Sequence, residues 1–215
     1  MPSTFITLIL RLPGFLLAIS VHEYAHARMA YQLGDDTAEL SGRMTLEPWA
    51  HFDIIGALML LVVGFGWARP VPVDPYRLRN PRRDMAKIAF AGPLANLITA
   101  FVLEIATILL FTAHRFSGAW SYIPIVLSVG ARINAGLAVF NLIPVPPLDG
   151  SRILELYIPY RAQHIWDEFQ RYGFIILVAL LMLGVISAVM EPLVTGYIGL
   201  AQKVGLSLSL LFRSP

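Results

Sequence analysis

The 215-residue sequence contains no cysteine. This absence excludes disulfide bonds, thiolate metal sites and cysteine nucleophiles, and it leaves His and carboxylate side chains as the ligands of any metal. Charged residues are also scarce, at 14% of the chain against 57% hydrophobic residues, whereas a soluble globular domain has about 25% charged residues. The net charge of +2 gives no basic surface that would indicate a nucleic-acid partner. The composition therefore predicts a protein that lies in a lipid bilayer.

Long apolar runs dominate the chain, and a helix needs roughly 20 such residues to cross a membrane. The run at 54–68 is short for a span and rich in glycine, so we predict a re-entrant segment there. The prolines in the following stretch, 69–75, forbid a helix interior and favour an extended edge strand or a polyproline segment. We predict a short β element at the membrane face. The apolar runs cover residues 5–21, 54–68, 88–113, 122–143, 173–190 and 193–212.

The sequence thus predicts an all-α polytopic membrane protein in a single domain, residues 1–215. The first helix is expected to continue through His26 to about Leu33 and to end at Gly34, because glycine commonly follows the last helical residue. Residues 151–172 mix charged with aromatic and apolar side chains, as interfacial helices do. The region of about 151–215 is therefore expected to contain interfacial and membrane helices.

Basic residues set the expected orientation, because cytoplasmic loops of membrane proteins are enriched in Lys and Arg. Two loops carry them, and both are expected to be cytoplasmic. This places the N-terminus outside, with four spans and one dipping segment. The basic residues are Arg69, Arg77, Arg79, Arg82, Arg83 and Lys87 in one loop, and Arg152, Arg161 and Arg171 in the other.

The first apolar helix ends in the motif His22-Glu23-Tyr-Ala-His26. Two His four residues apart project from one face of a helix and can bind the same Zn²⁺, with Glu23 beside them as a catalytic base. Such a short motif also arises by chance in soluble chains. Inside a membrane helix, however, these side chains are costly to desolvate and usually face a partner or a water-filled cavity. The motif therefore predicts a zinc site.

Asp149 is the predicted third ligand, since a catalytic zinc needs three protein ligands and one open position. It ends the stretch Pro144-Val-Pro-Pro-Leu-Asp149, in which prolines break a membrane segment and expose backbone that only a cavity or a protein partner can satisfy. The alternative is a loop acid that caps the following helix. Both His26 and Asp149 stand at the ends of their segments, and they share the cytoplasmic side if 54–68 re-enters. One zinc ion per chain is expected there.

The sequence allows more than one role for the other polar residues in or beside the apolar runs. Asn96 and Asn141 are candidates for binding the substrate backbone or the oxyanion, with ordinary helix-to-helix hydrogen bonds as the alternative. Glu104 and Arg132 are matched in depth on consecutive spans and are expected to form a buried pair. His51 and Asp53 are an outer support of the site, a pair that gates substrate entry, or simply part of a polar loop that enters the membrane.

The same motifs resemble the site-2 protease family of intramembrane metalloproteases. The resemblance rests on Ser20 to Ala27, Ala91-Gly-Pro-Leu-Ala-Asn96 and Asn141 to Gly150, in that order, and extends over nearly the whole chain. It is nearest to small bacterial members that lack PDZ and CBS domains. One departure is Ile54, where relatives often carry proline.

The resemblance implies a three-helix catalytic core, about residues 4–150. It also implies zinc held by His22, His26 and Asp149, Glu23 as the base, and transmembrane substrates cut after their helix unwinds. The expected function is zinc-dependent intramembrane proteolysis in a prokaryotic cell membrane, with the active site near the cytoplasmic side. Two alternatives remain, a zinc-binding adaptor without proteolysis and a transporter. The sequence identifies neither the substrate nor the regulation nor the oligomeric state.

Overall fold

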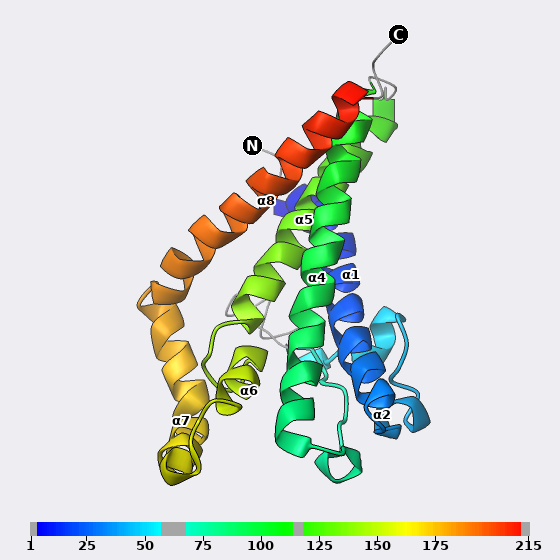
Figure 1. The fold of residues 1–215 in the computed structure, drawn as a ribbon. Coiled ribbons are helices and arrows are strands. Elements are labelled where there is room, and N and C mark those ends of the chain that lie inside the picture. Colours follow the sequence, from blue (N-terminus) through cyan, green and yellow to red (C-terminus); the bar gives the residue numbers. More distant parts are fainter. Residues whose placement is uncertain (1–3, 57–67, 114–117, 212–215) are drawn as a thin grey trace. The chain divides into compact units, whose positions relative to one another are not determined.

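The protein is described by a computed structural model in which residues 4–56, 68–113 and 118–211 are placed (Figure 1). All regular elements within these ranges are helical, and none is a strand. Short 3-10 helices at Pro48–His51, Pro75–Arg77, Gly118–Ser121 and Tyr160–Ala162 join longer ones. The α-helices are α1 (Thr4–Gln32), α2 (Thr37–Leu40), α4 (Pro81–Thr112), α5 (Tyr122–Asn141), α6 (Asp149–Glu155), α7 (Gln163–Met182) and α8 (Val185–Leu211).

Three of these helices, α4, α5 and α8, are long and apolar enough to cross a membrane. The predicted all-α fold is therefore confirmed for the described residues. Four spans were expected, and three helices there are of membrane length and apolarity. The predicted re-entrant segment lies mostly outside the described residues, since 57–67 are not among them. It stays a prediction.

The described chain divides into two compact units. Unit 1 contains residues 4–18, 96–113, 118–140 and 178–211, and unit 2 contains residues 19–56, 68–95 and 141–177. The helices α1, α4 and α7 each begin in one unit and end in the other. The single domain expected over 1–215 stays a prediction.

Unit 1 packs through small side chains. Its buried cluster contains Ala100, Ala131, Ala135, Val194 and Ile198. A Cβ atom added at Gly14 of α1 would lie 2.6 Å from the Cα of Gly130 of α5, so the two backbones touch. Small residues at such contacts allow close packing where lipid removes most of the hydrophobic driving force between helices.

Two charged residues of unit 1 correct the sequence prediction. Glu104 was expected to pair with Arg132, but its carboxylate accepts a hydrogen bond of 2.7 Å from Gln202 of α8. Arg132 instead lies 3.5 Å from Glu191, also on α8. Equal depth on α4 and α5 does not identify the partners of these side chains, because α8 supplies both.

The helix boundary near the C-terminus also differs from the apolar runs. The runs suggested a break between 190 and 193, where Pro192 stands. The structure instead ends α7 at Met182, with Gly184 at a φ of +73°, a conformation that glycine adopts without steric cost. Pro192 lies inside α8.

In unit 2, α1 ends at Gln32 and Gly34 follows with a φ of +107°, as predicted. The carboxylate of Asp35, fully buried, then accepts hydrogen bonds from the N–H of Thr37 at 3.0 Å and of Asp74 at 2.7 Å. Val73 packs nearby against a cluster that includes Ala30. The end of α1 thereby fixes the stretch that leads into α4.

That stretch, Arg69–Asp74, is the predicted β element, and the prediction is wrong: it forms no strand. Pro70 and Pro72 remove two of its N–H donors, so a regular ladder cannot form along it. The N–H groups of Val71 and Asp74 bind the carboxylates of Glu23 and Asp35, at 2.9 and 2.7 Å. Side chains of α1 and the following turn therefore hold an irregular extended segment in place.

Candidate metal centre

The two histidines of the motif lie one turn apart on α1, in unit 2. Their Nε2 atoms are 2.9 Å apart. Oδ2 of Asp149, the first residue of α6, lies 3.1 Å from Nε2 of His22 and 3.3 Å from Nε2 of His26. The three ligand atoms all fall within 4.8 Å of one another. The structure thus brings together the three residues that the sequence predicted as ligands.

This donor set fits a zinc ion. Atoms bound to tetrahedral zinc at about 2.0–2.2 Å lie roughly 3.3–3.5 Å from each other, close to the separations seen here. Oδ2 of Asp149 is buried, and within the described residues it accepts no hydrogen bond, although two imidazole nitrogens are near. A buried carboxylate oxygen without a donor is costly, and a cation between the three atoms would remove that cost.

His26 is oriented for metal binding by the backbone of α4. Its Nδ1 donates a hydrogen bond of 2.7 Å to the carbonyl oxygen of Ile88. A neutral imidazole that carries its proton on Nδ1 presents a lone pair at Nε2, the atom that faces His22 and Asp149. The carbonyl of Ile88 therefore selects the tautomer that a metal ion requires.

Gly92 of α4 forms the wall behind both imidazoles. A Cβ atom added there would lie 2.5 Å from Nε2 of His26 and 2.8 Å from Cε1 of His22. No side chain larger than hydrogen fits without displacing the rings. The glycine of the motif Ala91-Gly-Pro thus has a steric function that the sequence resemblance left unexplained.

The chain between α5 and α6 delivers Asp149 to the histidines. Its prolines prevent α5 from continuing past Asn141. A Cβ atom added at Gly150 would lie 2.3 Å from the carbonyl oxygen of Leu142, so the start of α6 presses directly on this connection. Ser151 also donates a hydrogen bond of 2.6 Å to the carbonyl of Leu148. These contacts fix the position of the carboxylate.

Glu23 lines the same cavity as the three ligands and is 9% exposed. Its Oε2 accepts a hydrogen bond of 2.9 Å from the N–H of Val71. The stretch Arg69–Asp74 therefore orients the carboxylate that the sequence assigned as the base.

Arg43 holds that stretch, and sequence reasoning missed it. Arg43 is 8% exposed, and its guanidinium donates hydrogen bonds to the carbonyls of Arg69, at 2.7 Å, and Pro70, at 3.3 Å. Burial lowers the pKa of Arg43, repulsion by Arg69 lowers it further, and attraction to Glu23 opposes both effects. The sequence carries no signal for this contact, because both acceptors are backbone oxygens 26 and 27 residues away.

The remaining predicted residues divide between the two units. Asn141 lines the cavity, which has a volume of about 550 Å³. Asn96, fully buried in unit 1, donates from Nδ2 to the carbonyl of Ala18 and to Oδ1 of Asn134, each at 2.9 Å. These are bonds between helices, the alternative that the sequence left open, and the oxyanion role of either Asn stays a prediction.

His51 and Asp53 do not bond to each other. Nε2 of His51 donates to the carbonyl of Thr45 at 2.8 Å, and Asp53 accepts from the N–H of Gly56 at 2.7 Å. The carbonyl of His51 accepts a hydrogen bond of 2.9 Å from the N–H of Arg69. His51 therefore supports the stretch that Arg43 holds, as an outer part of the site.

Gly92→Ala should weaken zinc binding by about 10- to 100-fold, because the added methyl group displaces the imidazoles. Zinc affinity measured by competition with a chromophoric chelator, on purified protein in detergent, checks this. Gly136→Ala is the matched control, since a Cβ atom there meets nothing within 4 Å. Equal affinities for the two variants would contradict the steric role of Gly92.

Comparisons with known proteins agree with the geometry. The chain matches the model of "Peptidase family M50" over residues 116–184. The protein named "Putative zinc metalloprotease YwhC" of Bacillus subtilis is 39% identical over 195 residues, which cover 90% of this chain and 86% of that protein. "Putative zinc metalloprotease Rip2" of Mycolicibacterium smegmatis is 30% identical over 179 residues, 81% of this chain and 67% of that one.

An archaeal relative, "Putative zinc metalloprotease MJ0611" of Methanocaldococcus jannaschii, is 31% identical over 134 residues, 62% of this chain and 63% of that protein. No solved structure matches the chain significantly. The identity with the Bacillus subtilis protein extends over most of both sequences, and with the family match it shows that this chain belongs to peptidase family M50, the site-2 proteases.

Proposed function

We propose that this chain is a zinc-dependent intramembrane endopeptidase that hydrolyses peptide bonds of transmembrane substrate proteins. The observation that carries the proposal is the convergence of His22, His26 and Asp149 in one cavity with Glu23. Membership of family M50 and the names of the relatives support a metalloprotease activity. The apolar helices support a place in the bilayer.

One zinc ion per chain would be held by the Nε2 atoms of His22 and His26 and by Asp149. When bound, zinc supplies Lewis acidity, which polarises a carbonyl group and lowers the pKa of water towards about 7. The three side chains are neutral or anionic ligands drawn from α1 and α6. Three protein ligands are the number that catalytic zinc sites use.

Glu23 acts in this proposal as the general base. It takes a proton from the attacking water, whose oxygen bonds to the carbonyl carbon, and passes that proton to the nitrogen of the departing amine. The C–N bond breaks, and a fragment with a new carboxylate and a fragment with a new amine leave. The hydrogen bond from Val71 fixes one oxygen of the carboxylate, which limits the orientations available to the other. Asn141, in the same cavity, is the candidate donor to the developing oxyanion.

The stretch Arg69–Asp74 is proposed to receive the substrate. Pro70, Val71 and Val73 line the cavity beside Glu23. We propose that an unwound substrate lies along this stretch in extended form. Few backbone hydrogen bonds would join the two, because Pro70 and Pro72 lack N–H donors and the N–H of Val71 is bound to Glu23. A helical peptide bond is shielded by its own hydrogen bonds, and the extended form would keep the scissile bond exposed.

The proposed setting is a prokaryotic cell membrane, with the site near its cytoplasmic side. The basic loops that contain residues 69–87 and 152–171 support this orientation. The partners are the lipid bilayer and transmembrane proteins or peptides, and no nucleic acid is expected.

Glu23→Gln should retain zinc but cleave a transmembrane substrate at least about 100-fold more slowly, because the amide cannot accept the water proton. Asp149→Asn should bind zinc weakly and also lose activity. Zinc content and cleavage of a single-span substrate in liposomes test both variants. A Glu23→Gln variant that cleaves as fast as the unmodified protein would show that Glu23 is not the base. An unmodified protein that binds zinc but cleaves no substrate would favour an adaptor or a transporter.

Arg43→Gln should lower kcat about ten- to hundredfold while leaving zinc content unchanged. The variant loses the hydrogen bonds to the carbonyls of Arg69 and Pro70, which hold the N–H of Val71 in position to bind Glu23. Arg43→Lys, which keeps a charged donor, should restore part of the activity. Arg28→Gln on the exposed face of α1 is the matched control. Full activity in Arg43→Gln would show that the stretch is positioned without this guanidinium.

A further inference from the structure

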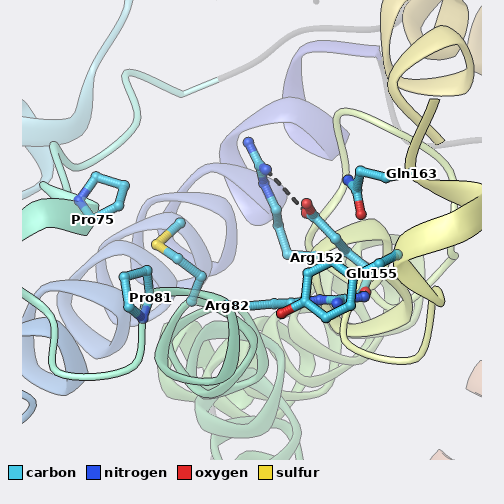
Figure 2. Close-up of a pocket in the computed structure, with 8 residues that line it drawn as sticks. Pro75, Pro81, Arg82, Arg152, Glu155 and Gln163 are labelled. Carbon is cyan, nitrogen blue, oxygen red and sulfur yellow. Dashed lines mark hydrogen bonds and ion pairs between the residues drawn. The ribbon is translucent and has the colours of Figure 1, made fainter.

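A second cavity lies next to the candidate metal centre in unit 2. It has a volume of about 440 Å³ and is formed by the starts of α4 and α7, by α6 and by the turn at Pro75. Met85 and Arg152 line both cavities, so the two cavities border the same pair of side chains. Figure 2 shows Pro75 and Pro81 on one side of the second cavity, and Glu155 and Gln163 on the other, with Arg152 between them.

The charge in this cavity is unbalanced. Two guanidinium groups, of Arg82 and Arg152, face a single carboxylate, that of Glu155. Arg82 binds only backbone among the described residues: it donates to the carbonyl oxygens of Glu155 and Ile158 and lies 5.3 Å from the ring centre of Tyr160. Backbone oxygens do not neutralise its charge. The cavity therefore carries an excess positive charge beside an apolar wall.

Arg152 is able to bind a further acceptor. Within the described chain its one hydrogen-bond partner is Glu155, at 3.2 Å, whereas a guanidinium has five N–H donors in a planar fork that suits a carboxylate. The same oxygen of Glu155 also accepts from Gln170 at 3.3 Å, so Glu155 keeps a donor if Arg152 turns away. The side chain of Arg152 is 49% exposed, and solvent or a ligand can reach it.

The helix α6 sets the distance between this cavity and the metal ligands. Asp149 begins the helix and Arg152 follows three residues later, so the two side chains lie on neighbouring positions of one helical turn. A group bound to Arg152 is therefore held at a fixed offset from the place where the peptide bond would be cut.

We propose that this second cavity is a substrate subsite that binds an Asp or Glu side chain of the substrate through Arg152, with Pro75, Pro81 and Met85 contacting the apolar part of the same segment. This proposal rests on the proposed proteolytic function and adds to it a preference for substrates with an acidic residue. Substrates with an acidic residue a short distance from the scissile bond should be bound more tightly than neutral ones. A charge-assisted, bidentate contact of this kind is among the stronger hydrogen-bonded interactions.

The test uses fluorescent single-span peptides whose tails carry three Asp, three Asn or three Lys, placed in separate sets before and after the span. Binding is measured on full-length Glu23→Gln protein in neutral detergent, so that neither cleavage nor anionic lipid contributes. The variants are Arg152→Gln and Arg152→Glu in this background. Arg171→Gln is the matched control, because Arg171 forms the same type of exposed pair, 3.2 Å from Glu168, outside both cavities.

In one of the two sets, with the tail before or after the span, the Asp peptide should bind at least about tenfold more tightly than the Asn peptide. Arg152→Gln should abolish this preference, Arg152→Glu should shift it to the Lys peptide, and Arg171→Gln should leave it unchanged. Zinc content equal to that of the parent protein shows that α6 is intact.

The subsite is wrong if the parent protein shows no preference, if Arg152→Gln keeps it, or if Arg152→Gln weakens all three peptides alike. Failure of the proposed function is a separate result. It would appear as a lack of cleavage of every peptide by the protein with Glu23 intact, whatever the binding preference.

Discussion

The structure depends on the convergence of two imidazole nitrogens and one carboxylate oxygen in a buried place. Nε2 of His26 presents a lone pair, because Nδ1 donates its proton to the carbonyl of Ile88. Oδ2 of Asp149 is buried with no hydrogen-bond donor among the described residues. Electron-rich atoms at 2.9 to 3.3 Å from each other repel unless a cation or a proton lies between them. The neighbouring helix α4 holds the imidazoles in this arrangement, through the carbonyl of Ile88 and the close contact at Gly92.

Missing backbone donors shape the two irregular segments of the site. Prolines after Asn141 end α5 and allow the chain to turn so that α6 begins at Asp149. Prolines at 70 and 72 prevent a regular ladder, and the remaining N–H of Val71 is directed to Glu23. Side-chain hydrogen bonds hold both segments, and the close contact of Gly150 with Leu142 adds to them in the segment before α6. Asp149, the proposed ligand, and Glu23, the proposed base, are therefore held in place by irregular segments.

The sequence predicted the elements that follow from local chemistry. The position of His22 and His26 on one helix, and the end of that helix before Gly34, could be inferred without coordinates, and the structure has both. The structure also places Asp149 beside the two histidines, and its role as the third ligand stays a prediction. Each rests on a rule about neighbours along the chain or on the ligands that zinc accepts.

Contacts between distant segments could not be predicted in the same way. The partner of Glu104 is Gln202, 98 residues away, and the acceptors of Arg43 are backbone oxygens, which have no residue identity to recognise. The stretch 69–74 looked like a β element because its prolines and valines favour extended chain, but a strand also needs a neighbour with which to pair. In the sequence, Arg152 is recognisable only as one of the basic residues that indicate a cytoplasmic loop.

The account is tested most directly by X-ray absorption at the zinc edge of the purified protein, compared with His26→Ala. It predicts four nitrogen or oxygen ligands at about 2.0–2.1 Å, with two imidazoles in the unmodified protein and one in the variant, if the variant retains metal. A protein that takes up no zinc, or a spectrum whose imidazole count is unchanged in His26→Ala, would contradict the assignment of His22, His26 and Asp149 as the metal site.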